Sequence, residues 1–257
     1  MNCPFSFGHS PERMTARDSI SDYYNLTHPH RWAGKTDFEH RLGTFQARGR
    51  GTRSQNHPPE PSLGILHVPH ADILLRTGED VTAERMAAYL ADPSERRSAS
   101  VHAFTDRDSF IITQPFDSEA WGAGNSNANA AAIQFEIGGR LNSGDAYWRS
   151  DDALKKYVQT AKAVVQGSYL AFGDQWEWAV PPLEKAELSR DGSVRRKGWT
   201  QHREVPFFNN QTRTYNQPDE SNLVQGQNPD ITPNFPWDVW FEVLATEMIR
   251  FRTEGGL

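Results

Sequence analysis

Two histidines and an aspartate are the residues of this chain best suited to metal chemistry. His202 ends a short apolar run in the segment GWTQHREV, and Asp230 follows in the proline-punctuated stretch NPDITPNFPW. His67 ends an earlier apolar run, LGILH. Imidazole and carboxylate groups are good ligands for a borderline-soft divalent ion such as zinc. The three side chains predict a zinc site whose fourth position stays open to water.

The residues alone leave other roles open for these histidines. His67 could be a buried histidine that is hydrogen-bonded to backbone. The segment LGILH, considered without the other motifs, favours that role. His70 is a rival ligand three positions further on, and His102 could face the site from a neighbouring strand. We interpret the remaining histidines of the first 40 residues as surface residues.

Composition excludes several classes of protein. The 257 residues contain no run of about 18 apolar residues, so no membrane-spanning helix is expected. The net charge of −6 argues against a nucleic-acid partner. The single cysteine, Cys3, rules out an intramolecular disulfide framework. No basic patch followed by an apolar segment opens the chain, so we expect no secretory signal.

Patterning divides the chain into an extension with a linker, residues 1–60, and one domain, residues 61–257. The extension carries seven aromatic residues between Phe5 and Phe45, so part of it should dock on the domain. The stretch ARGRGTRSQNHPPEPS reads as the linker.

Strands and helices alternate within the domain. We expect strands at 63–67 and 133–137, a hairpin with arms at 101–105 and from 110, and helices at 82–91, 151–172 and 236–252. Residues 122–129 read as a loop and residues 184–197 as an exposed charged insertion. This order predicts an α/β fold, with a mixed central β-sheet flanked by helices.

Several side chains have specific expected positions in these helices. Thr82 and Ser150 should cap the first and second helices. Apolar residues at helical spacing should face the core, namely Leu154, Val158, Ala161 and Val165 in the second helix and Trp240, Val243, Leu244 and Met248 in the third.

Glu136 lies inside an otherwise apolar predicted strand. A carboxylate is costly to bury unless it is paired or used, so it could serve chemistry. An edge position that faces water is the alternative.

Five segments together resemble a known family: ILH, SVHAFTDRDSFIITQ, AWGAGNSNANAAAIQFEIGG, GWTQHREV and DITPNFPW. Their order resembles that of zinc-dependent N-acetylmuramoyl-L-alanine amidases, the family of amidase-type phage endolysins and peptidoglycan recognition proteins. The resemblance covers roughly residues 63–252.

The resemblance implies roles for individual residues. It implies that His67, His202 and Asp230 bind Zn²⁺ and that Glu136 is the catalytic carboxylate. Val101 lies where another branch of the family has a tyrosine, so the chain is similar to the glutamate branch. Candidate substrate or oxyanion contacts are Asn228, His102, Trp121 and Asn125.

Two departures from the family pattern stand out. Asn228 lies where the family usually has a lysine that helps to stabilise the oxyanion. The stretch between His202 and Asp230 is also longer than expected, and its residues 207–227 could form a loop over the substrate groove.

The resemblance implies a monomeric peptidoglycan hydrolase that cleaves the amide bond between N-acetylmuramic acid and L-alanine. Without a signal peptide, the expected role is that of a phage endolysin, made in the host cytoplasm and acting on the cell wall after release. The alternatives are a non-catalytic peptidoglycan-binding protein and a cytoplasmic muropeptide-recycling amidase.

Overall fold

A computed structural model describes residues 51–52, 60–68, 82–91, 100–139, 144–209, 214–216 and 234–254. The predicted docking of the N-terminal aromatics therefore lies outside the described residues, as do His70, Asn228 and Asp230. No helix within these ranges is long and apolar enough to cross a membrane.

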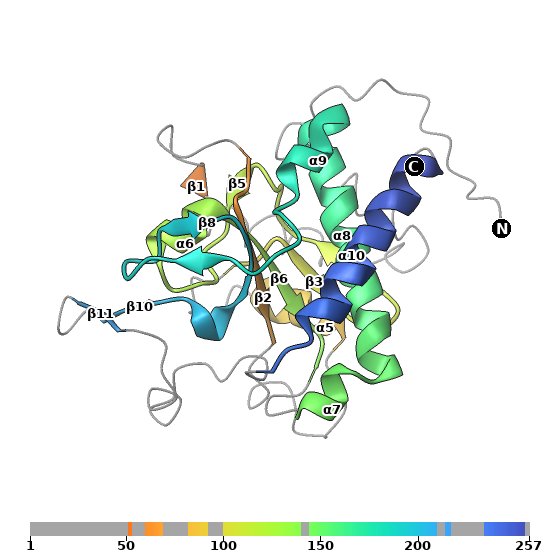
Figure 1. Cartoon of the computed structure of the whole chain (residues 1–257), viewed down its shortest axis with the longest axis horizontal. Helices are drawn as coiled ribbons and strands as arrows, with labels where there is room; N and C mark the ends of the chain where they lie inside the picture. Colours follow the sequence, from red (N-terminus) through yellow and green to blue (C-terminus); the bar gives the residue numbers. More distant parts are fainter. Residues whose placement is uncertain are drawn as a thin grey trace.

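A five-stranded sheet forms the centre of the domain (Figure 1). Its strands follow the order β4 (Phe110–Ile112), β3 (Ala103–Thr105), β6 (Ala132–Ile137), β2 (Leu63–His67) and β9 (Gly198–Gln201). All neighbours pair in parallel except β3 and β4, which form the predicted antiparallel hairpin. The mixed sheet is therefore confirmed.

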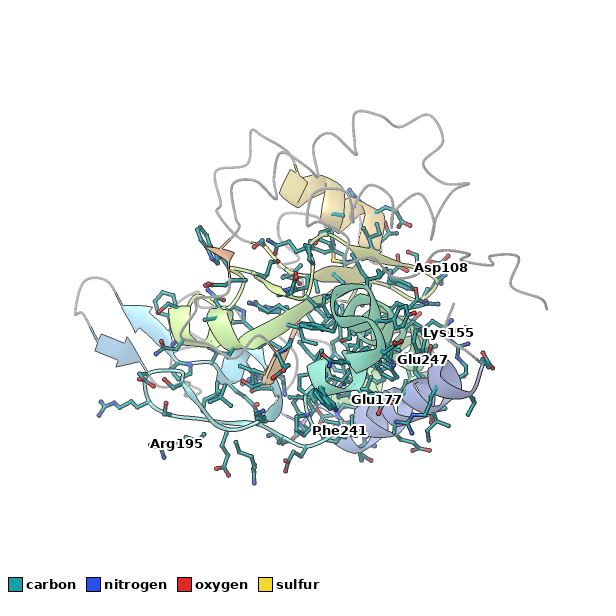
Figure 2. The ribbon with its side chains drawn as sticks, turned by 90° about the horizontal axis from the view of Figure 1, so that it is seen from above. Asp108, Lys155, Glu177, Arg195, Phe241 and Glu247 are labelled. Atoms are coloured by element: carbon teal, nitrogen blue, oxygen red, sulfur yellow. The ribbon has the colours of Figure 1, made fainter. Side chains whose placement is uncertain are left out.

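Three of the described helices flank this sheet. The long helix α8 (Asp151–Phe172) packs on β3, β4 and β6 and on the C-terminal helix α10 (Trp237–Thr253). The shorter helix α5 (Ala83–Ala91) contacts β3 and β4, and in Figure 2 it lies on the other side of these strands from α10. The predicted α/β architecture is confirmed.

Short elements complete the described part of the chain. Two-residue strands β1 and β5 pair, β7 and β8 form a hairpin within the exposed insertion, and β10 pairs with β11. Their bounds, with those of the short helices, are β1 Gly51–Thr52, β5 Ser118–Glu119, α6 Ser126–Ala131, α7 Asp145–Trp148, η1 Gly173–Gln175, α9 Trp176–Ala179, β7 Glu187–Leu188, β8 Val194–Arg196, η2 His202–Glu204, β10 Phe207–Asn209 and β11 Thr214–Asn216.

The two faces of the sheet differ in chemistry. Side chains alternate along a strand, so Leu66, Phe135 and Trp199 all point towards α8 and α10 and join the main core there. The opposite face carries a smaller apolar cluster that includes Leu63 and Ile65. Polar side chains can therefore collect on this opposite face, where the long helices do not pack.

The core face of α8 differs from the prediction in its first two turns. Leu154 is 42% exposed, whereas Lys156 and Tyr157 are fully buried. Tyr157 donates a hydrogen bond to the Trp148 carbonyl oxygen (2.8 Å), and Lys156 forms an ion pair with Asp152 (2.8 Å). These polar contacts favour burial of a face of α8 that is rotated from the one that the apolar residues predict. Ala161 and Val165 are buried as predicted.

The predicted loop at 122–129 is wrong in its second half, which begins helix α6. Asn125 caps the helix, because its side-chain oxygen accepts hydrogen bonds from the backbone N–H groups of Asn127 (3.0 Å) and Ala128 (3.1 Å). The alanines that follow have the highest helix propensity of any residue. A good cap followed by alanines therefore outweighs the turn signal of the asparagines.

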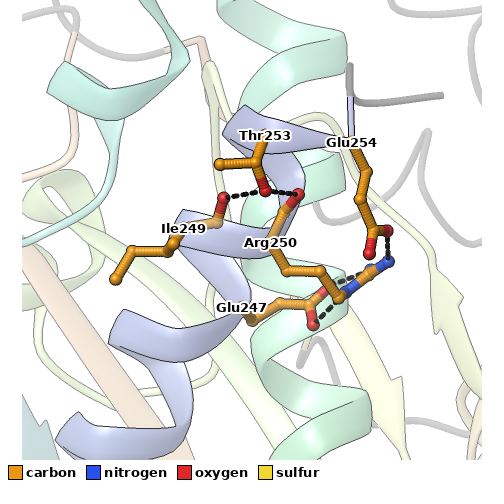
Figure 3. Close-up of polar contacts among 5 residues, drawn as sticks. All are labelled: Glu247, Ile249, Arg250, Thr253 and Glu254. Carbon is orange, nitrogen blue, oxygen red and sulfur yellow. Dashed lines mark hydrogen bonds and ion pairs between the residues drawn. The ribbon is translucent and has the colours of Figure 1, made fainter.

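Both predicted helix caps are confirmed. Thr82 Oγ1 accepts a hydrogen bond from the Arg85 N–H (3.2 Å), and Ser150 Oγ accepts one from the Ala153 N–H (3.3 Å). The last turns of α10 are held by Arg250, which binds the buried Glu247 (Nε to Oε2, 2.9 Å) and Glu254 (2.6 Å; Figure 3).

A buried aspartate links the β3–β4 hairpin to α5. Asp106 Oδ2 accepts a hydrogen bond from the Ala83 N–H (2.8 Å), while Oδ1 accepts from the N–H groups of Asp108 (3.0 Å) and Ser109 (2.7 Å). Burial alone would raise the pKa of Asp106, but these backbone donors outweigh it and hold the pKa below its usual value. The ionised form is thus the one that stabilises the fold.

We predict that Asp106→Asn lowers the free energy of unfolding by about 1–3 kcal/mol, because an amide nitrogen would face one of the three N–H donors. The pKa of Asp106 is lowered in the folded protein. The stabilisation that its ionised form gives the wild type is therefore present above the unfolded pKa of about 3.9 and is lost as the pH falls through the folded pKa. Urea unfolding at several pH values should show the two proteins converging in acid.

The exposed Asp117 is the matched control. Asp117→Asn should change the free energy of unfolding by no more than about 0.5 kcal/mol. A constant difference between Asp106→Asn and the wild type from neutral pH to acid would contradict the assigned role.

Candidate active site

The two histidines predicted to bind metal lie side by side. His67 is the last residue of β2, and His202 follows the last residue of β9 directly. Because β2 and β9 are parallel neighbours, their carboxyl ends meet at one edge of the sheet. The centroids of the two imidazole rings are 4.6 Å apart, and the ring planes are tilted by 46°.

Glu136 lies beside this pair. It pairs in register with His67 across the parallel strands β6 and β2. Strand β6 runs between β3 and β2, so the alternative of an edge position is excluded. Alternation along β6 puts Glu136 on the face opposite Phe135, away from the long helices. The side chain is partly buried, at the carboxyl end of the parallel strands, where both histidines also lie.

These side chains fit part of a metal site. Two neutral imidazoles are suitable zinc ligands, at about 2.0–2.1 Å from the ion, and a ring separation of 4.6 Å lets both approach one ion. Among the described residues no group of three or more His, Cys, Asp or Glu side chains is placed to hold a metal. A complete site would need a further ligand, and the expected one, Asp230, lies outside the described residues.

Gln134, which the sequence motifs did not identify, contacts His67. Its Oε1 lies 3.1 Å from His67 Nε2, and the side chain is fully buried. Gln134 lies two positions before Glu136, so both side chains share one face of β6. A polar residue at that spacing in an apolar strand was the signal that could have identified it.

His102 lies in the interior of the domain. Its Nδ1 accepts a hydrogen bond from the Gln134 N–H (3.0 Å), so its Nε2 carries the proton and donates to the Ser118 carbonyl oxygen (3.1 Å). The ring is completely buried and packs edge-on against Phe116. These contacts favour a structural role in strand pairing over the candidate role in substrate binding.

Asn125 links three segments. Beyond its capping role, its side-chain Nδ2 donates to the carbonyl oxygens of Asp191 (3.1 Å) and Pro206 (2.7 Å). The first carbonyl belongs to the β7–β8 hairpin, whose Arg195 projects away from the domain in Figure 2. The second lies four residues after His202, and Asn125 is only 1% exposed. Its contacts favour a scaffolding role.

Trp121 lies near the candidate site with an exposed side chain. The neighbouring residues Ala120 and Gly122 both lie against the side-chain amide of Gln134. The side chain of Trp121 itself is 38% exposed. Its backbone N–H donates to Ser100 Oγ (2.9 Å). Trp121 therefore keeps its position as a candidate substrate contact.

The mixed sheet thus brings His67, His202 and Glu136 to one end of its parallel strands. Residues 58–175 match the sequence profile of the N-acetylmuramoyl-L-alanine amidase family, Amidase_2. Residues 58–175 of the chain are thus similar to N-acetylmuramoyl-L-alanine amidases. The matched residues include His67 and Glu136 but end before His202.

Solved structures of similar shape were also found. One is described as the structure of PlyL, with 16% identity and a TM-score of 0.41, covering 78% of this chain and 91% of that one. Another is Staphylococcus aureus hydrolase AmiA in complex with its ligand, with 17% identity and a TM-score of 0.40, covering 77% of this chain and 83% of that one. No curated protein matched the chain.

We predict that Asn125→Asp destabilises the protein more than its conservative chemistry suggests. The variant keeps the capping oxygens but loses both donated hydrogen bonds, and it brings a carboxylate towards two carbonyl oxygens. The expected loss is about 1–3 kcal/mol, measured by thermal or urea unfolding.

Asn127 provides the matched control, because its Nδ2 donates to the same Asp191 carbonyl oxygen (3.1 Å) from a partly exposed position. Asn127→Ala should stay within about 0.5 kcal/mol of the wild type. Equal stability of Asn125→Asp and the wild type would refute the scaffolding role.

Proposed function

We propose that this chain is a zinc-dependent N-acetylmuramoyl-L-alanine amidase that cleaves the bond between N-acetylmuramic acid and L-alanine in peptidoglycan. The observation that carries the proposal is the pair of imidazole rings 4.6 Å apart, with Glu136 in register beside His67. The family match over residues 58–175 supports the same reaction. We also propose that residues 61–257 form the catalytic domain and residues 1–60 an extension.

In this proposal His67, His202 and Asp230 hold the metal. Two neutral imidazoles and one carboxylate complete a three-ligand set of the kind found in catalytic zinc sites. Bound zinc supplies an activated water and polarises the amide carbonyl. The buried His67 contributes a ring held in place by β2, which limits the entropy lost when a ligand is fixed.

Glu136 is the proposed proton carrier. A carboxylate beside the attacking water accepts the proton that the water loses. The same group then delivers that proton to the nitrogen of the departing L-alanine, since an amine anion is a poor leaving group. General acid–base catalysis of this kind contributes about 10²- to 10⁴-fold.

Trp121 and Asn228 are proposed to contact the substrate. The exposed indole of Trp121 offers an apolar surface for the substrate. Asn228 takes the place of the usual lysine and offers the oxyanion a neutral hydrogen-bond donor, a contact that contributes about 10²- to 10³-fold where it operates.

We predict that His202→Ala abolishes both zinc binding and turnover, whereas Glu136→Gln retains zinc but loses about 10²-fold or more in turnover. Glutamine has nearly the shape of glutamate but cannot take up the proton of the water. Zinc content is measured by elemental analysis, and turnover by mass spectrometry of the L-alanine amino termini freed from purified peptidoglycan.

The control is Glu187→Gln on the exposed β7–β8 hairpin, where Glu187 pairs with Arg196 (3.0 Å) at the surface. This variant should match the wild type in zinc content and turnover. Wild-type turnover by Glu136→Gln would remove Glu136 from the proposed mechanism, and full activity of His202→Ala after chelation would refute the zinc-dependent reaction. A wild type that binds peptidoglycan without cleaving it would favour the alternative of a recognition protein.

We further propose that the protein acts as a phage endolysin on intact cell walls. An endolysin should lower the turbidity of purified whole walls and of cells with permeabilised outer layers. A recycling amidase would release L-alanine amino termini only from soluble muropeptides, so turbidity and mass spectrometry on the two substrates separate these roles.

A further inference from the structure

The buried amide of Gln134 is oriented by contacts that leave it no freedom to flip. The Ala123 N–H donates to Asn129 Oδ1 (2.9 Å), which identifies that atom as the oxygen. Gln134 Nε2 lies within hydrogen-bond distance of this oxygen (3.1 Å) and of the Ala120 carbonyl oxygen (2.8 Å). Two acceptors therefore identify the donor end of the Gln134 amide.

The other end of the amide then acts on His67. Gln134 Oε1 can only accept, and it lies 3.1 Å from His67 Nε2. For this contact to be a hydrogen bond, Nε2 must carry a proton and donate it. The neutral ring then has its lone pair on Nδ1, so the contact selects one of the two tautomers of His67.

The surroundings of the amide show that this arrangement is built into the fold. Gln134 and His67 are both buried, and a buried amide is costly unless its polar atoms are hydrogen-bonded. Gly122 makes room for it, because a Cβ at that position would come within 2.5 Å of Gln134 Oε1 and 2.9 Å of the Ser100 carbonyl oxygen. The amide is thus fixed from three sides.

We propose that Gln134 is a positioning residue that sets the tautomer of His67, so that Nδ1 is the atom offered to the metal. Metal-binding histidines commonly donate their second ring N–H to a fixed acceptor, which orients the ring and raises its basicity as a ligand. This inference rests on the proposed zinc-dependent function. It adds a residue and a specific ring nitrogen that the spacing of ligands in the sequence does not predict.

The first test needs no substitution. Nitrogen-15 NMR of the full chain, stripped of metal with a chelator and held at a pH where His67 is neutral, distinguishes a protonated from an unprotonated ring nitrogen. The expected result is a slowly exchanging proton on Nε2 and an unprotonated Nδ1. A proton on Nδ1 would overturn the proposal.

The second test removes the acceptor. Gln134→Met keeps an unbranched side chain of similar length but removes the oxygen that accepts from His67. The Nε2–H proton of His67 should therefore exchange rapidly with solvent. Zinc affinity, measured by competition with a chromophoric chelator, should fall about 10- to 100-fold. Gln134→Glu retains an acceptor and should preserve the Nε2–H signal despite a loss of stability. Unchanged signal and zinc affinity in Gln134→Met would overturn the proposal.

Thr160→Val is the control for lost stability alone. Thr160 is a fully buried residue of α8, and its Oγ1 shares a hydrogen bond with Thr105 Oγ1 of β3 (2.7 Å). This contact lies on the face of the sheet that packs against α8. This variant should be destabilised without any change in the His67 signal or in zinc affinity. If it changed both as strongly as Gln134→Met, the role of Gln134 would reduce to stability and the proposal would fail.

The outcomes also separate this inference from the proposed function. A wild type that binds zinc and cleaves peptidoglycan, but protonates His67 on Nδ1, contradicts only the role of Gln134. A wild type that binds no zinc contradicts the proposed function and the metal role of Gln134, even where His67 carries its proton on Nε2.

Discussion

The parallel pairing of β2 with both of its neighbours is the constraint on which the candidate site depends. One neighbour, β6, brings Glu136 into register with His67, and the other, β9, ends at His202. The second pairing depends on Gly64, because a Cβ there would lie 2.2 Å from the indole of its register partner Trp199. The missing side chain lets the indole lie across β2 and enter the core.

Much of this arrangement could be predicted because local signals and tertiary packing agree. The run LGILH has the length and composition of a buried strand, and it forms β2. Ser150 followed by two aspartates begins α8 as expected, since a cap and acidic residues suit the positive end of a helix. The proximity of His67 and His202 followed from the resemblance to a family, because spacing alone does not report which strands are neighbours.

The features that could not be predicted depend on contacts between distant segments. Near its start, α8 buries Lys156 instead of Leu154 because Tyr147 and Asp152 accept hydrogen bonds from the ammonium group, and no apolar periodicity encodes that contact. The role of Gln134 could not be predicted for the same reason. Its partners Ala120 and Asn129 come from a loop and a short helix, and the sequence pattern predicts a loop where that helix forms.

The order of the strands also has a consequence for how the protein folds. About half of the chain's length separates His67 from His202, yet the two rings touch across adjacent strands. Pairings between such remote segments slow folding, because a large loop must close before its contacts form. During synthesis β2 and β6 can pair early, but β9 has to emerge before the histidines meet. A ribosome-bound fragment that ends before Gly198 would therefore expose one edge of β2, open to pairing with another chain.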